Sequence, residues 1–150
     1  AVFPGQPKVQ LPGELRVTGF LDTCRQAGVE PIVVTTDESQ FAARDYRGTI
    51  RAALRAHPEI DGVFATSDVM AAQVIQECAK VGRSIPQDVS LVGFDDVDIA
   101  SLTNPPLTTI HQPLEQMCEY AVDGILRKLR GETVPVKTIL PVSRVDRESV

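Results

Sequence analysis

Residues 61–96 read DGVFATSDVMAAQVIQECAKVGRSIPQDVSLVGFDD. The apolar run at 62–66 predicts a strand, and Ser67 with Asp68 then opens a helix. Helical spacing places five apolar residues on one face of that helix: Ala71, Val74, Ile75, Cys78 and Ala79. The run at 89–94 is apolar on both faces, as parallel strands covered by helices usually are. The stretch therefore predicts a strand, a helix and a second strand joined by a right-handed crossover.

The same alternation continues toward the N-terminus. Apolar residues recur at helical spacing before Gly28, which predicts a helix with these positions on one face: Val17, Phe20, Leu21 and Cys24. Residues 31–34 (PIVV) predict a strand. Ser39 can cap a second helix that ends before Pro58 and carries an apolar face of Tyr46, Ile50, Ala53 and Leu54.

Toward the C-terminus, a long helix is predicted between Pro113 and Gly131, with an apolar face of Leu114, Cys118, Ala121, Val122, Ile125 and Leu129. Residues 136–142 (VKTILPV) predict a last strand, and the polar tail at 143–150 is expected at the surface. Alternating strands and helices are typical of α/β proteins. We therefore expect a doubly wound, mostly parallel sheet with helices on both faces.

The composition excludes several classes of protein. A chain of 150 residues that is 43% hydrophobic can bury the core of one domain, and no apolar run has the length of a membrane span. A net charge of −5 without a basic stripe argues against nucleic-acid binding by these residues alone. No nucleophile elbow, dinucleotide loop, P-loop or metal-spaced histidine pair occurs, so we expect neither an enzyme nor a cofactor. An odd number of widely spaced cysteines indicates buried free thiols rather than a disulfide framework or a zinc site: Cys24, Cys78 and Cys118.

Polar residues follow three of the predicted strands. These strand ends carry Thr35, Thr36 and Asp37, then Ser67 and Asp68, then Asp95 and Asp96. Ligands of open α/β sheets bind beyond the carboxyl ends of the strands. Carboxylates there can accept hydrogen bonds from the vicinal hydroxyls of a sugar, and an arginine can donate two in return. The alternatives are a plain helix cap for Asp68 and plain turn residues for Asp95 and Asp96.

Three stretches resemble the LacI/GalR family of bacterial transcription repressors: RVTGF at 16–20, the run from 61 to 113 with its SLVGFDD and PPLTTI motifs, and LPVSRVDRES at 140–149. The resemblance implies an effector-binding core similar to periplasmic sugar-binding proteins. Residues 1–112 would then form the C-terminal subdomain, 113–135 a crossover helix to the N-terminal subdomain, and 136–150 a strand and tail that return. It also implies that the DNA-binding helix-turn-helix and most of the N-terminal subdomain lie outside this chain.

The function that the resemblance implies is a cytoplasmic, sugar-responsive repressor that binds a carbohydrate effector and shifts the affinity for operator DNA. The alternative is the periplasmic sugar-binding protein of a transport system, which shares the fold and the cleft. Residue by residue, Arg16 matches the family's clamp on sugar hydroxyls, and Asp95 matches its carboxylate acceptor. Ser67 stands where asparagine is frequent, and Phe41 lies near the ring-stacking aromatic. We expect Arg16 and Asp95 to approach one another across the carboxyl edge of the sheet.

The resemblance also implies a homodimer. The segment around Leu102 and the outer face of helix 68–81, with Met70 and Ala72, would form its interface, although Leu102 could instead cover a sheet edge. The prolines at 105, 106 and 113 stiffen the crossing segment LTTIH. His111 within that segment is expected to be a satisfied polar residue rather than a titrating switch.

Overall fold

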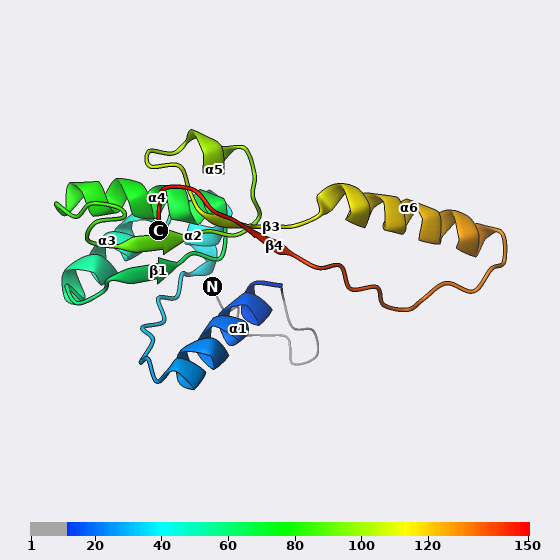
Figure 1. The fold of residues 1–150 in the computed structure, drawn as a ribbon, viewed down its shortest axis with the longest axis horizontal. Helices are drawn as coiled ribbons and strands as arrows, with labels where there is room; N and C mark the ends of the chain where they lie inside the picture. Colours follow the sequence, from blue (N-terminus) through cyan, green and yellow to red (C-terminus); the bar gives the residue numbers. More distant parts are fainter. Residues whose placement is uncertain (1–11) are drawn as a thin grey trace.

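The computed structural model describes residues 12–150 and arranges them as a layered body from which one long helix projects (Figure 1). In chain order the elements are α1 (Pro12–Ala27), α2 (Glu38–Ala43), α3 (Arg47–Ala56), β1 (Gly62–Phe64), α4 (Asp68–Lys80), β2 (Ser90–Val92), α5 (Ile99–Leu102), β3 (Thr109–His111), α6 (Leu114–Leu129) and β4 (Ser143–Val145). No helix within residues 12–150 has the length and apolar character needed to cross a membrane.

The strands form a mostly parallel arrangement. β1 pairs in parallel with β2, with Val63 opposite Leu91. A parallel bridge between Val92 and Thr108 connects β2 to the segment that leads into β3. β3 then pairs with β4 in the antiparallel sense, with Ile110 opposite Arg144. The predicted α/β fold with a mostly parallel sheet is confirmed.

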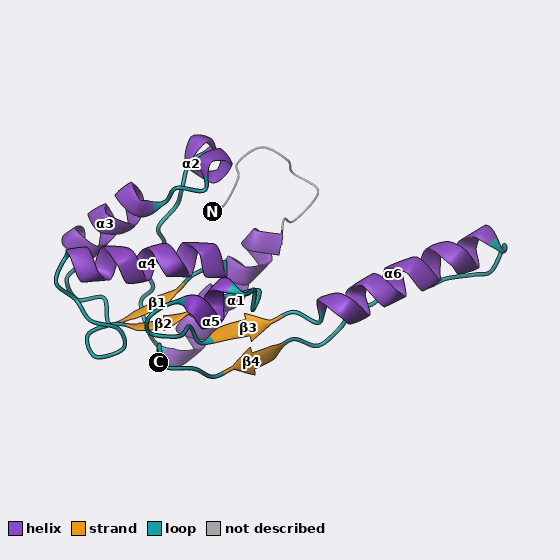
Figure 2. Cartoon of the chain, turned by 90° about the horizontal axis from the view of Figure 1, so that it is seen from above, coloured by secondary structure: helices purple, strands orange, loops and turns teal. Residues whose placement is uncertain are grey.

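The core lies on the face of the sheet that α3 and α4 cover (Figure 2). It consists of Tyr46, Ile50, Leu54, Ala65, Ala71, Val74, Cys78, Ile85, Val89, Leu91, Ala100 and Leu107. Successive side chains of a strand point to opposite faces, so Val63 packs against this core while Phe64 points away from it. Phe64 stacks instead on Phe20 of α1, with 5.6 Å between the ring centroids. Helices therefore cover both faces, as predicted.

The helix predicted to begin at Ser39 is two helices. Asp37, not Ser39, caps α2, and its side chain accepts from the backbone N–H of Gln40. The chain then breaks at Arg44, whose φ of 50° is left-handed, before α3 begins. Both aspartate and serine can cap a helix, and here Asp37 lies three residues before the free N–H of Gln40. The Ser39 hydroxyl donates to the same Asp37 carboxylate at 2.6 Å, so Ser39 does not act as the cap.

Two predicted strands are wrong. Residues 31–34 and 136–142 pair with no other strand among residues 12–150, and they leave Ile32, Val33 and Ile139 exposed. A cavity of about 280 Å³ opens between residues 29–36 and the core beside β1. An apolar run becomes a strand only when a neighbour supplies a hydrogen-bonding edge, and neither run has one here.

The tail expected at the surface is instead part of the fold. Ser143–Val145 forms β4, and Ser149 is fully buried. The Ser149 hydroxyl donates to the Leu91 carbonyl at 2.6 Å and accepts from the Thr108 N–H at 2.8 Å. The tail thus fills the space between β2 and residues 107–109, and it satisfies backbone groups that would otherwise be buried without partners.

The projecting helix α6 keeps its apolar face in solvent. None of its residues is buried, and the exposed apolar residues include Leu114, Met117, Tyr120, Val122, Ile125, Leu126 and Leu129. The predicted thiol burial holds for Cys78, whereas Cys24 is intermediate and Cys118 is exposed on the projecting helix α6. The division into residues 1–112, 113–135 and 136–150 stays a prediction.

Glu77 is a fully buried carboxylate of α4, and it should make the stability of the fold depend on acid pH. Hydrogen bonds from Arg51 and Lys80 lower the pKa of Glu77 from 4.5 to about 2. Because the folded state holds the charged form, this stabilisation is present above pH 4.5 and is lost as the pH falls toward 2. Glu77→Gln should therefore melt well below wild type at pH 6, and the gap between the two melting temperatures should be smaller at pH 3 and should close as the pH reaches about 2. A melting-temperature gap that is as large at pH 3 as at pH 6 would contradict this role of the Glu77 carboxylate.

Candidate functional site

The turn after β2 carries the site. Gly93, Phe94, Asp95 and Asp96 follow Val92, and both aspartates have left-handed backbones, with φ of 117° and 58°. Such angles cost energy for residues with a side chain, so the surroundings must hold them. The Asp95 N–H donates to the Ile110 carbonyl at 2.9 Å, which ties the turn to β3.

Arg16 and Asp95 meet at this edge, as the sequence predicted. Nη2 of Arg16 lies 3.1 Å from Oδ1 of Asp95, and the two side chains are 18% and 26% exposed. Nη1 of Arg16 donates to the Thr66 carbonyl at 2.7 Å, at the end of β1. The guanidinium also lies 3.9 Å from the centre of the Phe94 ring, which adds a cation–π contact. Two strand ends and an aromatic face therefore fix the arginine of α1.

Asp95 is a charged group that the protein solvates incompletely. Burial raises the pKa of Asp95 above its ordinary value, and the nearby Arg16 charge offsets this only in part. Gln112 donates to Oδ1 at 2.7 Å, the same oxygen that faces Arg16. Within residues 12–150, Oδ2 accepts no hydrogen bond. An additional donor, such as a ligand hydroxyl, would therefore stabilise the carboxylate.

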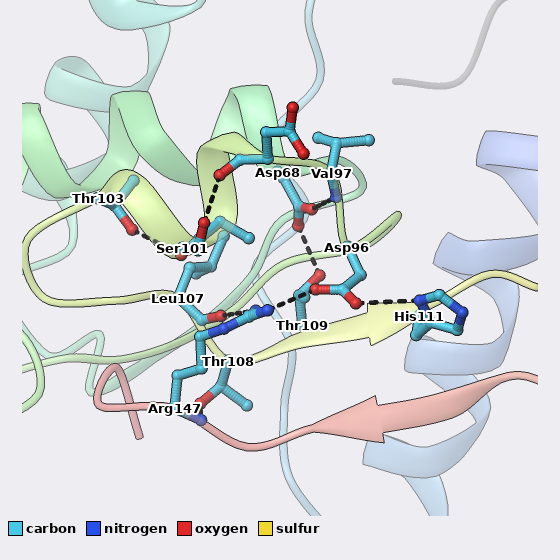
Figure 3. Close-up of polar contacts among 12 residues, drawn as sticks. Asp68, Asp96, Val97, Ser101, Thr103, Leu107, Thr108, Thr109, His111 and Arg147 are labelled. Carbon is cyan, nitrogen blue, oxygen red and sulfur yellow. Dashed lines mark hydrogen bonds and ion pairs between the residues drawn. The ribbon is translucent and has the colours of Figure 1, made fainter.

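Asp68 supports the turn from beneath and is not the cap of α4. Ser67 takes that role, since its hydroxyl accepts from the Met70 N–H. Asp68 is fully buried, and its carboxylate accepts from the Thr109 hydroxyl at 2.5 Å and from the Val97 N–H at 2.9 Å (Figure 3). Its own N–H donates to the Phe94 carbonyl. Asp68 thus binds both ends of the turn that presents Asp95.

Asp96 is held by residues from two other segments. Oδ1 accepts from Nη2 of Arg147 at 2.7 Å, and Oδ2 lies 3.0 Å from Nδ1 of His111 (Figure 3). Burial works against the charged form, but the hydrogen bonds from Arg147 and His111 outweigh it and lower the pKa of Asp96. His111 therefore has a polar partner, as expected.

A family model described as a periplasmic binding protein-like domain matches residues 1–150. The chain belongs to this family. The ribose operon repressor of Halalkalibacterium halodurans is 34% identical over 146 residues, which are 95% of this chain and 43% of that repressor.

Solved structures of the same family superpose on the chain. The transcriptional regulator CelR in complex with cellobiose gives a TM-score of 0.82 at 30% identity, over 97% of this chain and 45% of that one. A lac repressor dimer bound to operator and the anti-inducer ONPF gives 0.79 at 25% identity, over 92% and 48%. The chain therefore spans less than half the length of these proteins. The predicted resemblance to LacI/GalR regulators is confirmed.

Within this family member, the other predicted ligand residues have different surroundings. Ser67 is half-buried and uses its hydroxyl oxygen at the start of α4, at the same strand end as Arg16's partner Thr66. Phe41 lies on α2 and is 53% exposed. The structure brings Arg16 and Asp95 into contact, whereas the ligand roles of Ser67 and Phe41 stay predictions.

The predicted interface residues also differ from one another. Leu102 is 79% exposed on α5. Ala72 is 7% exposed, and Met70 packs against the core, so their expected position on the outer face of α4 is wrong. The reason is that α3 and α5 both pack against α4, so they cover residues of α4 that lie outside its apolar face.

Sequence reasoning missed one residue of the site, Gln112, and the supporting role of another, Asp68. Gln112 comes directly after β3, so the rule that selected Asp95 at the end of β2 could have selected it as well. The role of Asp68 had no sequence signal, because its partners Val97 and Thr109 are 29 and 41 residues away. Among residues 12–150, no cluster of three or more metal-binding side chains could hold a metal ion.

Proposed function

We propose that this chain is part of the effector-binding core of a sugar-responsive transcriptional repressor. The observation that carries the proposal is the Arg16–Asp95 pair at the carboxyl edge of the sheet, 3.1 Å apart, in a chain whose relatives are operon regulators. The relatives' names favour this function over the periplasmic binding protein of a transport system. A regulator of this kind acts in the cytoplasm and catalyses no reaction.

The chemistry of the edge suits a carbohydrate. A sugar presents neighbouring hydroxyls that can each donate one hydrogen bond and accept another. Oδ2 of Asp95 would accept from one hydroxyl, and the guanidinium of Arg16 would donate to an adjacent one. Ser67 and Phe41 would add a hydroxyl contact and an aromatic face for the sugar ring. Operator DNA would be bound by the part of the full-length protein that corresponds to the rest of its relatives.

A sugar panel tests the proposal. We expect at least one of D-ribose, D-xylulose, cellobiose and lactose, or a phosphorylated derivative, to raise the melting temperature of the full-length protein. The same sugar should change the affinity for operator DNA, as measured by fluorescence anisotropy. A full-length protein that no sugar or sugar phosphate stabilises would contradict the proposal.

We further propose that the full-length protein is a homodimer and that Leu102 lies in its interface. At 79% exposed, Leu102 does not cover the sheet edge, and a partner surface would remove its side chain from water. Leu102→Glu should then give monomers, because it would bury a charge without a partner. Multi-angle light scattering at low micromolar concentration would measure this, with Ser101→Glu on the same helix as the control. If the Leu102→Glu protein is still a dimer, the interface does not include Leu102.

A further inference from the structure

The adjacent aspartates of the turn have separate partners. Asp95 faces Arg16 and Gln112 at the ligand edge, whereas Asp96 faces Arg147 and His111. Both residues hold left-handed backbone angles. Because the two residues are adjacent in one turn, the partners of one carboxylate also restrain the backbone that presents the other.

The partners of Asp96 lie in the two chain segments that connect the body to α6 (Figure 1). His111 is the last residue of β3, which leads out to α6. Arg147 follows β4, which returns from it, by two residues. The Asp96 carboxylate therefore bridges the outgoing and the returning segment of the chain, and its side chain is only 16% exposed.

Arg147 is itself held in place. Its Nη1 donates to the Leu107 carbonyl at 2.8 Å, and its backbone N–H donates to the Thr108 hydroxyl at 2.9 Å. Two residues later, Ser149 anchors the tail between β2 and residue 108. The Arg147 guanidinium is therefore held in one place, and it can fix the position of the Asp96 carboxylate.

We propose that Asp96 and Arg147 are positioning residues that hold Asp95 in the geometry needed for effector binding and tie it to the strands β3 and β4. This inference rests on the proposed function, because it takes Asp95 as the ligand-binding group. It assigns a role to a residue of the tail that does not touch the ligand edge. The link consists of three contacts: Arg147 to Asp96, Asp96 to His111, and the Asp95 N–H to Ile110.

Hydrogen–deuterium exchange on the full-length protein tests the link without any sugar. Asp96→Asn and Arg147→Met should each speed exchange in peptides that cover residues 93–97 and 107–112, while peptides of α4 stay protected. The matched control is Arg144→Met, which removes an equivalent arginine from β4 that pairs only with the nearby Asp146 among residues 12–150. Unchanged exchange at 93–97 in both variants would overturn the proposal.

Sugar affinity provides the second readout, with the panel of D-ribose, D-xylulose, cellobiose and lactose as probes. Asp96→Asn and Arg147→Met should each weaken binding by about tenfold, and the double variant should be no weaker than either single one, because both break the same link. Asp96→Glu and Arg147→Lys should recover part of the affinity, and they carry the same test if a more drastic variant does not fold. Losses that add in full, or a loss in Arg144→Met as large as in Arg147→Met, would refute the positioning role.

The two readouts separate the failure of this inference from the failure of the proposed function. If wild type binds none of the sugars, the proposed function fails, whereas the exchange at 93–97 still decides whether Arg147 and Asp96 hold the turn. If wild type binds a sugar and the variants bind it equally well, the proposed function stands and the positioning role is wrong.

Discussion

Gly93→Ala should lower the free energy of unfolding by about 3 kcal/mol, because it adds a methyl group where neighbouring side chains leave no space for one. A Cβ at this position would collide with Oδ1 of Asp68 and would lie 2.8 Å from a methyl carbon of Leu107. Asp68 cannot move aside without losing its bonds to Thr109 and Val97. The substitution therefore forces a choice between a steric clash and a buried carboxylate without partners, and either outcome is destabilising.

Urea denaturation followed by circular dichroism would measure this change. Gly62→Ala is the matched control, since Gly62 lies on the neighbouring strand β1 and a Cβ there would meet no atom within 4 Å. We expect Gly62→Ala to change the unfolding free energy by well under about 1 kcal/mol. If both variants lose the same stability, the effect belongs to strand glycines in general and not to the space that Asp68 fills.

Asp95→Ala should weaken sugar binding by about 2–4 kcal/mol, because it removes the acceptor of a charge-assisted hydrogen bond from a partly dry edge. The loss has two parts. The ligand hydroxyl loses its acceptor, and Arg16 loses the carboxylate that lies 3.1 Å from its Nη2. Folding should survive, since Asp95 is not one of the core residues.

Isothermal titration with the sugar that stabilises wild type would measure the loss. Asp95→Asn separates charge from shape, because asparagine tolerates left-handed backbone angles better than alanine does and keeps the size of the side chain. Asp98→Ala is the control, since Asp98 is an exposed residue of the same loop whose side chain makes no cap bond to α5. An affinity that is equal in wild type and Asp95→Ala would show that Asp95 does not bind the sugar.

Much of the fold follows from local patterns. Helical spacing of Ala71, Val74 and Cys78 predicts α4, and the run at 89–94, apolar on both faces, predicts β2. These predictions succeed because the faces that a segment buries set the period of its apolar residues. Asp95 could be identified as a ligand residue because polar side chains at strand ends meet at one edge of a parallel sheet. The prediction that Arg16 would meet it came from the family resemblance and is confirmed by their contact.

The remaining features depend on partners that are distant in sequence. Residues 31–34 look like a strand but have no edge to pair with, whereas residues 143–145 look like a polar tail and pair with β3. Arg147 reaches Asp96 across 51 residues, and no periodicity encodes that contact. The spacing of apolar residues along the sequence shows which face of a helix or strand is buried, because the directions of successive side chains are fixed by the helix or strand geometry. Hydrogen-bond partners and caps are chosen among competing groups only after the chain has folded, so the supports of Asp95 become visible only when β2, β3 and the tail lie side by side.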